Sequence, residues 1–153
     1  ARGVPVFQAS FGQGRVWASS TKQERRLTLT SATGDAVFAF CRDREGESGL
    51  VIHHHSDAPF GVLEEGHDCY VVSTKKGWKI TFRGDLQEGT VSATDEDGRL
   101  LAVSEPAGAR RSVRIGPLVD AGLVALAMLG MDTLDHLESK KVTRERGRLG
   151  SVI

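Results

Sequence analysis

The sequence has little cysteine or proline, which excludes some specialised protein classes. It contains two cysteines, Cys41 and Cys69, and four prolines among 153 residues. Two cysteines are too few for a disulfide framework, and a chain of this length does not need one. We therefore expect two reduced thiols, with a single bridge between them as the open alternative.

Excess charge, aromatic residues and long apolar runs are also missing. Twenty basic and twenty acidic residues cancel, and aromatic residues make up 6% of the chain. Neither feature fits a nucleic-acid-binding protein. Residues 121–131 form the longest uncharged run near the C-terminus, well short of the roughly 20 residues that cross a bilayer. The first ten residues lack the apolar core of a secretory signal. The sequence thus predicts a cytoplasmic protein without a transmembrane segment.

Glycine, in contrast, is abundant, and it separates short runs that alternate between apolar and polar residues. There are 18 glycines. Trp78, Ile80 and Phe82 fall on one side of such a run and polar residues on the other, as in a half-buried strand. Residues 4–115 contain about eleven runs of this kind, at the spacing of sandwiches and barrels. We predict a mainly β domain, with Trp78, Phe82, Phe38 and Phe40 in its core.

Turn signals stand between several of these runs. Residues 33–35 are Thr-Gly-Asp and are expected to form a hairpin turn. Asp97-Gly98 suits a two-residue type I′ turn, which needs positive φ at both positions. The sheet is therefore expected to be built from consecutive hairpins.

The pattern changes after Gly116-Pro117, where residues 118–131 are apolar on all sides. A helix of this composition is enclosed by protein or lipid, and its length argues against lipid. We expect Pro117 and Asp120 in its first turn and the preceding strands curled around it. Val124 and Leu126 should then be fully enclosed. One domain spans residues 1–139, and residues 140–153 form a basic tail, predicted to be exposed or poorly ordered.

This ending resembles that of the tubby C-terminal-like superfamily, which includes the tubby proteins, the phospholipid scramblases and the LURP-one-related proteins of plants. The similarity lies in residues 114–129, where Val119-Asp120 matches the pair that opens the central helix of LURP-one-related proteins. The Asp-Gly hairpin within residues 95–103 is also similar. The resemblance implies a closed antiparallel β-barrel of about twelve strands enclosing one apolar C-terminal helix. The charged tail departs from the family pattern.

Two groups of basic residues are candidates for binding an anionic ligand. Arginine offers bidentate hydrogen bonds to phosphate, and lysine offers a point charge. Tubby proteins bind phosphoinositides through basic residues on the barrel, so the resemblance implies a similar use here. The alternative is that these charges only solvate a strand face. The candidate residues are Lys75, Lys76, Lys79, Arg83, Arg110, Arg111 and Arg114.

The histidines raise a second hypothesis. His53 and His55 would lie on one side of a strand, a spacing that can supply two metal ligands, and His67 precedes Cys69 by two residues. A metal-dependent, cupin-like β-barrel enzyme is therefore the alternative function. The remaining elements of a cupin motif are missing, so strand-packing histidines are the preferred interpretation, with no metal and no cofactor.

No motif of nucleophilic catalysis or phosphate-binding glycine loop is present. We therefore predict a non-enzymatic binding module rather than an enzyme. Its ligand is predicted to be an anionic phospholipid headgroup or a protein partner, held on the exterior, since a helix fills the interior. Lipid binding would place this cytoplasmic protein at the periphery of a membrane.

Overall fold

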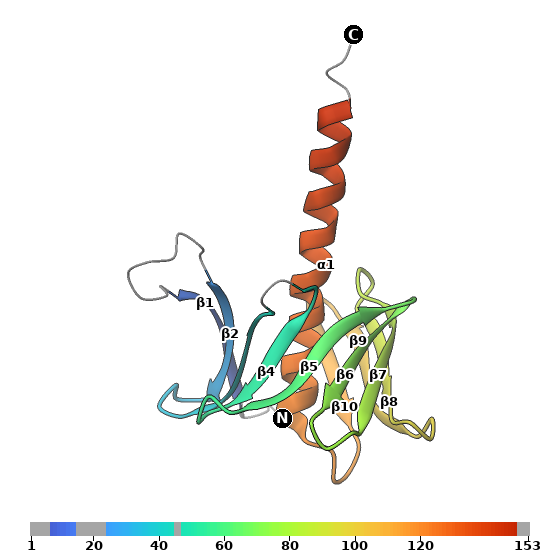
Figure 1. Cartoon of the computed structure of the whole chain (residues 1–153). Coiled ribbons are helices and arrows are strands. Elements are labelled where there is room, and N and C mark those ends of the chain that lie inside the picture. The colour runs from blue at the N-terminus through green and yellow to red at the C-terminus, as the bar shows by residue number, and fades with distance from the viewer. Residues whose placement is uncertain (1–6, 15–23, 45–46, 150–153) are drawn as a thin grey trace.

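The computed structural model describes residues 7–14, 24–44 and 47–149, which form ten antiparallel strands and one helix (Figure 1). The mainly β prediction and the single C-terminal helix are confirmed. The elements are β1 (Phe7–Gly14), β2 (Glu24–Ser31), β3 (Val37–Asp43), β4 (Leu50–His54), β5 (Pro59–Gly66), β6 (Cys69–Thr74), β7 (Lys79–Asp85), β8 (Thr90–Thr94), β9 (Leu100–Ala107), β10 (Arg110–Ile115) and α1 (Ala121–Leu149).

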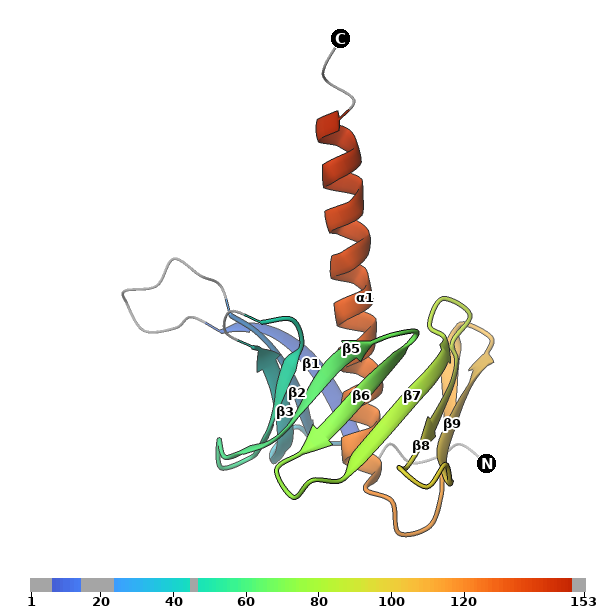
Figure 2. The same ribbon diagram turned by 45° about the vertical axis from the view of Figure 1, so that its right-hand side comes forward.

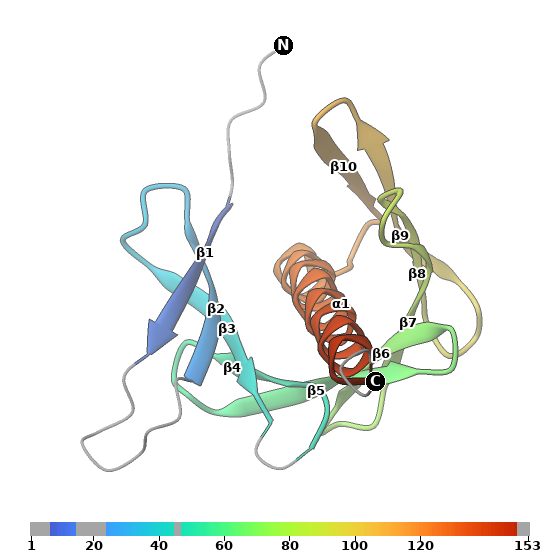
Figure 3. The same ribbon diagram turned by 90° about the horizontal axis from the view of Figure 1, so that it is seen from above.

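The strands form one sheet in sequence order, each paired with the next. This sheet curls around the helix but leaves β1 and β10 unpaired with each other, as the view along the helix shows (Figure 3). The predicted closed barrel is therefore wrong, and ten strands replace the expected twelve. Closure was implied only by the family resemblance. Alternating patterns specify which side of a strand is buried, but not whether the two outer strands meet.

The core lies between the concave side of the sheet and the first half of α1. Val124 and Leu126, predicted to be enclosed, are 0% exposed, which confirms this part of the prediction. Leucine, isoleucine, valine and phenylalanine side chains from the strands surround them. The largest fully buried strand side chains in this core cluster are Phe82, Leu29, Leu63, Ile80 and Val72.

The helix begins later and ends later than predicted. Leu118 has a φ of +63°, which is incompatible with a right-handed helix, so Pro117 lies in the preceding loop. Asp120 is instead the N-cap, because its Oδ1 accepts a hydrogen bond from the Leu123 N–H at 3.0 Å. At its other end α1 includes residues 140–149 of the predicted tail, and residues 150–153 lie outside the described part. None of the described helical residues make a helix long and apolar enough to cross a membrane.

Consecutive antiparallel strands place alternate connections at the same end of the sheet. Hairpins 32–36, 55–58, 75–78 and 95–99 and loop 116–120 therefore lie together, below the sheet in Figures 1 and 2. We call this end the base. The helix begins at the base and projects from the opposite end of the sheet.

The two predicted hairpin turns both lie at the base. The turn at residues 33–35 is confirmed, since it joins β2 to β3. At the second turn Gly98 has a φ of +77° but Asp97 does not have a positive φ, so the type I′ prediction is wrong. Asp95 Oδ1 accepts hydrogen bonds from the Asp97 and Arg99 N–H groups at 3.1 and 2.8 Å. These bonds stabilise a longer turn, which the Arg99 carbonyl closes by accepting from the Asp95 N–H.

Candidate functional site

The structure separates the predicted basic residues into two groups. Lys75, Lys76 and Lys79 lie at the base, in and beside the turn between β6 and β7, whereas Arg110 and Arg114 lie on β10. Arg83 is farther along β7. Strands β8 and β9 stand between the groups. A single binding site that uses all seven predicted residues does not form.

Two of these basic residues nevertheless share a row on the convex side of the sheet. Arg83 pairs with Ser92, Ser92 with Val103, and Val103 with Arg114. Three strand spacings put the two arginine backbones about 14 Å apart. Arg114 also donates a hydrogen bond to Glu105 Oε1 at 2.8 Å. This row is open to solvent but is partly neutralised.

Arg111 has a structural role on the concave side. Its guanidinium group lies 3.2 Å from both carboxylate oxygens of Asp132 on α1, and it also donates to the Leu86 carbonyl oxygen at 3.3 Å. The side chain therefore joins β10, the β7–β8 turn and the helix. Such a partly buried, multiply bonded guanidinium is held in place by the fold and is not free to bind a headgroup.

The base also carries exposed apolar side chains. Among the described residues seven large hydrophobic side chains are exposed, and five of them lie at the base: Val37, Phe38, Trp78, Leu100 and Leu118. Trp78 and Phe38, predicted to be core residues, are 38% and 45% exposed, so this prediction is wrong. Trp78 adjoins the β6–β7 turn, and Phe38 is the extra residue of a bulge in β3, between Val37 and Ala39, which pair with Thr30 and Leu29.

Leu118 is the most unusual residue of this group. Its side chain is fully exposed, and its backbone has the positive φ that bulky residues avoid. Burial in the core therefore does not explain the strained conformation. Strain of this kind persists where the surrounding structure fixes it, and it is frequent at functional sites.

A groove of about 710 Å³ lies among three of the five exposed apolar side chains of the base, Trp78, Leu100 and Leu118. Trp78 and Lys79 form part of its wall from the β6–β7 side, and Leu100 and Leu118 from the other. The acidic residues Asp95, Glu96 and Asp97 lie along the same groove. Asp95 is engaged in its turn and in an ion pair with Arg99 at 3.0 Å. The base is thus apolar with local charge of both signs.

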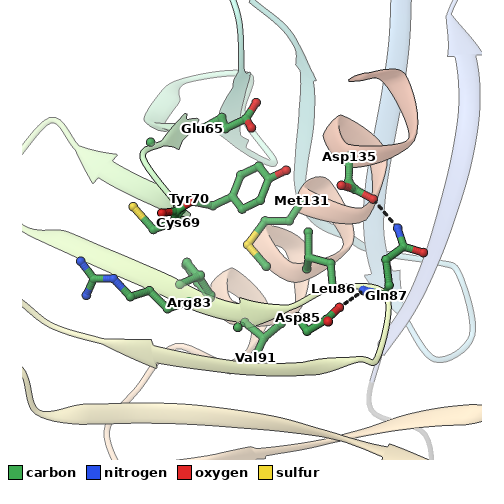
Figure 4. Close-up of a pocket in the computed structure, with 14 residues that line it drawn as sticks. Glu65, Cys69, Tyr70, Arg83, Asp85, Leu86, Gln87, Val91, Met131 and Asp135 are labelled. Carbon is green, nitrogen blue, oxygen red and sulfur yellow. Dashed lines mark hydrogen bonds between the residues drawn. The ribbon is translucent and has the colours of Figure 1, made fainter. Parts of the chain in front are cut away.

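A second cavity, of about 430 Å³, lies at the opposite end beside Met131 (Figure 4). Several carboxylates border it, but two of them have structural partners: Asp135 accepts from Gln87 Nε2 at 2.8 Å, and Asp85 Oδ1 accepts from the Gln87 N–H at 2.8 Å. The Arg83 side chain extends away from the helix in this view. These contacts fix the β7–β8 turn against α1.

The histidines do not converge. His53 is buried, with its ring stacked on Phe40 at 4.9 Å between centroids and Nδ1 2.9 Å from the Asp57 carbonyl oxygen. His55 lies in the turn after β4, at the base, whereas His67 lies in a turn at the opposite end. Within the described ranges no three His, Cys, Asp or Glu side chains are grouped to hold a metal ion.

The stack around His53 extends to a third side chain. The Arg26 guanidinium lies over the Phe40 ring, 3.6 Å from its centroid. Cation–π and aromatic stacking of this kind stabilise a packed surface layer. His53 Nε2 has no hydrogen-bond partner among the described residues. The buried position of this ring agrees with a packing role.

The two cysteines differ in environment. Burial, together with the nearby charge of Asp43, raises the pKa of the Cys41 thiol to about 12. Cys69 is partly exposed and lies on the opposite-end cavity. A thiol that stays protonated is a poor nucleophile, so Cys41 is a core residue.

The sequence did not predict that Trp78, Leu100 and Leu118 would lie exposed at the base. One signal was present: each of these residues adjoins a turn or loop, where alternation no longer implies burial. Comparison with known proteins adds no identification, since no family model, no curated protein and no solved structure matches this chain.

Proposed function

We propose that this chain is a non-enzymatic binding module that attaches to an anionic lipid surface through the base. The observation that carries the proposal concerns the seven large hydrophobic side chains that are exposed in the described part of the chain: five of them lie at the end that also holds Lys75, Lys76 and Lys79. Kinship with the tubby-like proteins is part of the same proposal. A mainly β sheet curled around one apolar helix supports it, and the open sheet is a difference.

The β6–β7 turn has the composition of a membrane-interface contact. Trp78 is flanked in sequence by Lys76 and Lys79, and tryptophan prefers the boundary between headgroups and acyl chains. None of the three lysines forms an ion pair with a described residue. Their charge is therefore available to lipid phosphates, each worth about 1 kcal/mol near an anionic surface.

Leu118 and Leu100 extend the same contact to the other side of the groove. Leu118 is fully exposed on a loop whose backbone is fixed by the Asp120 cap and by the Gly116 N–H, which donates to the Leu101 carbonyl oxygen at 2.8 Å. A rigidly presented apolar side chain loses little entropy on insertion. The acidic residues 95–97 on the same groove are repelled by an anionic surface, so the proposal requires the lysines and the inserted apolar side chains to outweigh them.

Cosedimentation with vesicles tests this proposal. The vesicles contain phosphatidylcholine with or without a phosphoinositide. We expect retention on the phosphoinositide vesicles only. Replacing Lys75, Lys76 and Lys79 with glutamine removes roughly 3 kcal/mol of attraction, about a hundredfold in partitioning. Because insertion contributes too, added salt weakens the retention without abolishing it.

Matched variants locate the contact. Arg83→Gln with Arg110→Gln removes two exposed cations away from the base and leaves retention unchanged. Leu118→Ser removes one apolar contact at the base and reduces retention. Equal effects of the lysine and arginine variants would show that total charge, rather than the base, is what matters, and would refute the proposal.

A further inference from the structure

The open side of the sheet exposes part of the helix and the free edges of β1 and β10. Figure 3 shows α1 uncovered between β1 and β10. Along this side of α1 the partly exposed residues Ala121, Ala125, Leu129 and Asp132 recur at intervals of four, four and three, so they form one face. Leu129 is 37% exposed, and Asp132 is the residue bound to Arg111 of β10. The exposed face therefore lies beside the β10 edge.

The backbone of β10 presents hydrogen-bonding groups at this edge. The Gly116 N–H donates to the Leu101 carbonyl oxygen, which makes that pair a hydrogen-bonded pair. Because such pairs alternate along an antiparallel ladder, the N–H and C=O groups of Arg111, Val113 and Ile115 point away from β9. The pairing of β9 with β10 has no bulge, and β10 contains no proline. The edge thus lacks two of the features that block strand addition.

Side chains on the two faces of β10 differ in character. Val113 pairs with Ser104, which is fully buried, so Val113 faces the concave side, yet it is 38% exposed because nothing described lies beyond it. The opposite face carries Arg110, Ser112 and Arg114. A strand added here would have one face against Val113 and Leu129 and the other beside two arginines.

We propose that β10 accepts an extended segment of a protein partner as an additional strand, in which apolar residues alternate with acidic ones. The apolar side chains cover Val113 and Leu129, and the acidic side chains lie beside Arg110 and Arg114. Backbone hydrogen bonds supply affinity, and the alternating side chains supply specificity. This inference uses a surface other than the base and does not depend on lipid binding.

Charge argues against a second copy of this chain as the occupant. In an antiparallel pairing of β10 with itself centred on Ser112, Arg110 of one copy would stand opposite Arg114 of the other, and like charges directly opposite are destabilising. Acidic residues at the same positions are favourable. The charges of β10 therefore favour an acidic partner segment over self-association.

Fluorescence anisotropy with a designed peptide tests the proposal. The probe is a labelled ten-residue peptide of alternating glutamate and valine. A lysine–valine peptide of the same pattern and a peptide with the glutamates and valines in two separate blocks are the comparisons. We expect the alternating glutamate–valine peptide to bind at least about tenfold more tightly than either. Hydrogen exchange at Val113 should slow when it binds.

Two variants make the test specific. Val113→Pro removes an N–H that points away from β9, and it should abolish peptide binding while retention on vesicles persists. Arg110→Glu with Arg114→Glu changes only exposed side chains, and it should reverse the preference from the glutamate peptide to the lysine peptide. Lys79→Glu with Arg83→Glu, on β7, is the control that leaves peptide binding unchanged.

Three results would overturn the inference. They are no binding of the glutamate–valine peptide, equal binding of the block-patterned peptide, and an unreversed preference in the double glutamate variant of β10. The last result is decisive even if Val113→Pro fails to fold. If the peptide does not bind but the protein is retained on vesicles, only the strand-addition inference fails. If the peptide binds but the protein is not retained on vesicles, only the lipid proposal fails.

Discussion

The enclosure of α1 predicts very different costs for two identical substitutions on the same helix. Leu126 is 0% exposed and lines a small pocket of about 90 Å³ together with Leu29 of β2 and Ile52 of β4. Leu126→Ala removes three buried carbon atoms and leaves a cavity that surrounding strands fill only in part. The expected loss in the free energy of unfolding is about 2–5 kcal/mol.

Leu129→Ala is the matched control. The same atoms are removed less than one helical turn away, but this side chain is 37% exposed on the open side. We expect a loss below about 1.5 kcal/mol, because less apolar surface was removed from water and no cavity forms. A more favourable helix propensity of alanine offsets part of it.

Urea unfolding followed by circular dichroism measures both losses. The free energies are compared by linear extrapolation, and a common m-value shows that the two variants expose the same surface on unfolding. Leu126→Ala should lower the midpoint clearly more than Leu129→Ala does. Equal losses at the two positions would refute the asymmetric enclosure of the helix.

Two further predictions concern Cys41 and Gly84. The pKa of Cys41 is raised to about 12, so the folded state keeps the thiol proton while the unfolded chain loses it from pH 9 upward. The free energy of unfolding therefore falls between pH 9 and 12. Urea unfolding of wild type and of Cys41→Ala at pH 8 and 10 should show this loss in wild type alone. Gly84 has a φ of +141°, and a Cβ there would lie 2.0 Å from the Thr90 carbonyl oxygen, so Gly84→Ala should lower the melting temperature strongly. Gly98→Ala, where φ is +77° and no atom lies within 4 Å, should cost only about 1–2 kcal/mol, and similar costs at both glycines would contradict the close approach of β7 and β8.

The helix and its burial could be predicted from the sequence because residues 118–131 are apolar in every direction. Val124 and Leu126 face the sheet whereas Leu129 lies on the open side, so the pattern predicted a buried helix but not which of its residues stays exposed. The start of the helix was harder to place. Pro117 and Asp120 both suit a first turn, and only the left-handed conformation of Leu118 shows that the helix begins after Asp120.

The strands could be predicted from alternation, but the ends of the strands could not. Trp78 has the same parity as Ile80 and Phe82, yet Ile80 and Phe82 are buried while Trp78 is exposed. Burial requires both the right parity and the presence of a covering element, and the helix does not cover the base. The alternation of apolar and polar residues does not indicate whether another element covers that part of the strand.

The basic residues show a similar limit. Arg110, Arg111 and Arg114 are close in the sequence, but Arg111 turns toward the helix and binds Asp132, 21 residues later. Such a long-range partner follows from the curvature of the sheet, which no local pattern specifies. Sequence proximity therefore correctly placed the three arginines on one strand, but it wrongly predicted that all three would share one binding role.

Depth-dependent quenching of Trp78 tests the central claim most directly. In a Trp17→Phe variant Trp78 is the only tryptophan, and its fluorescence is recorded with phosphoinositide vesicles that carry brominated acyl chains. Insertion of the base predicts a blue shift and quenching by bromine placed near the headgroups. A protein that is retained on these vesicles while Trp78 stays unshifted and unquenched would contradict the account, because another surface would then hold the lipid.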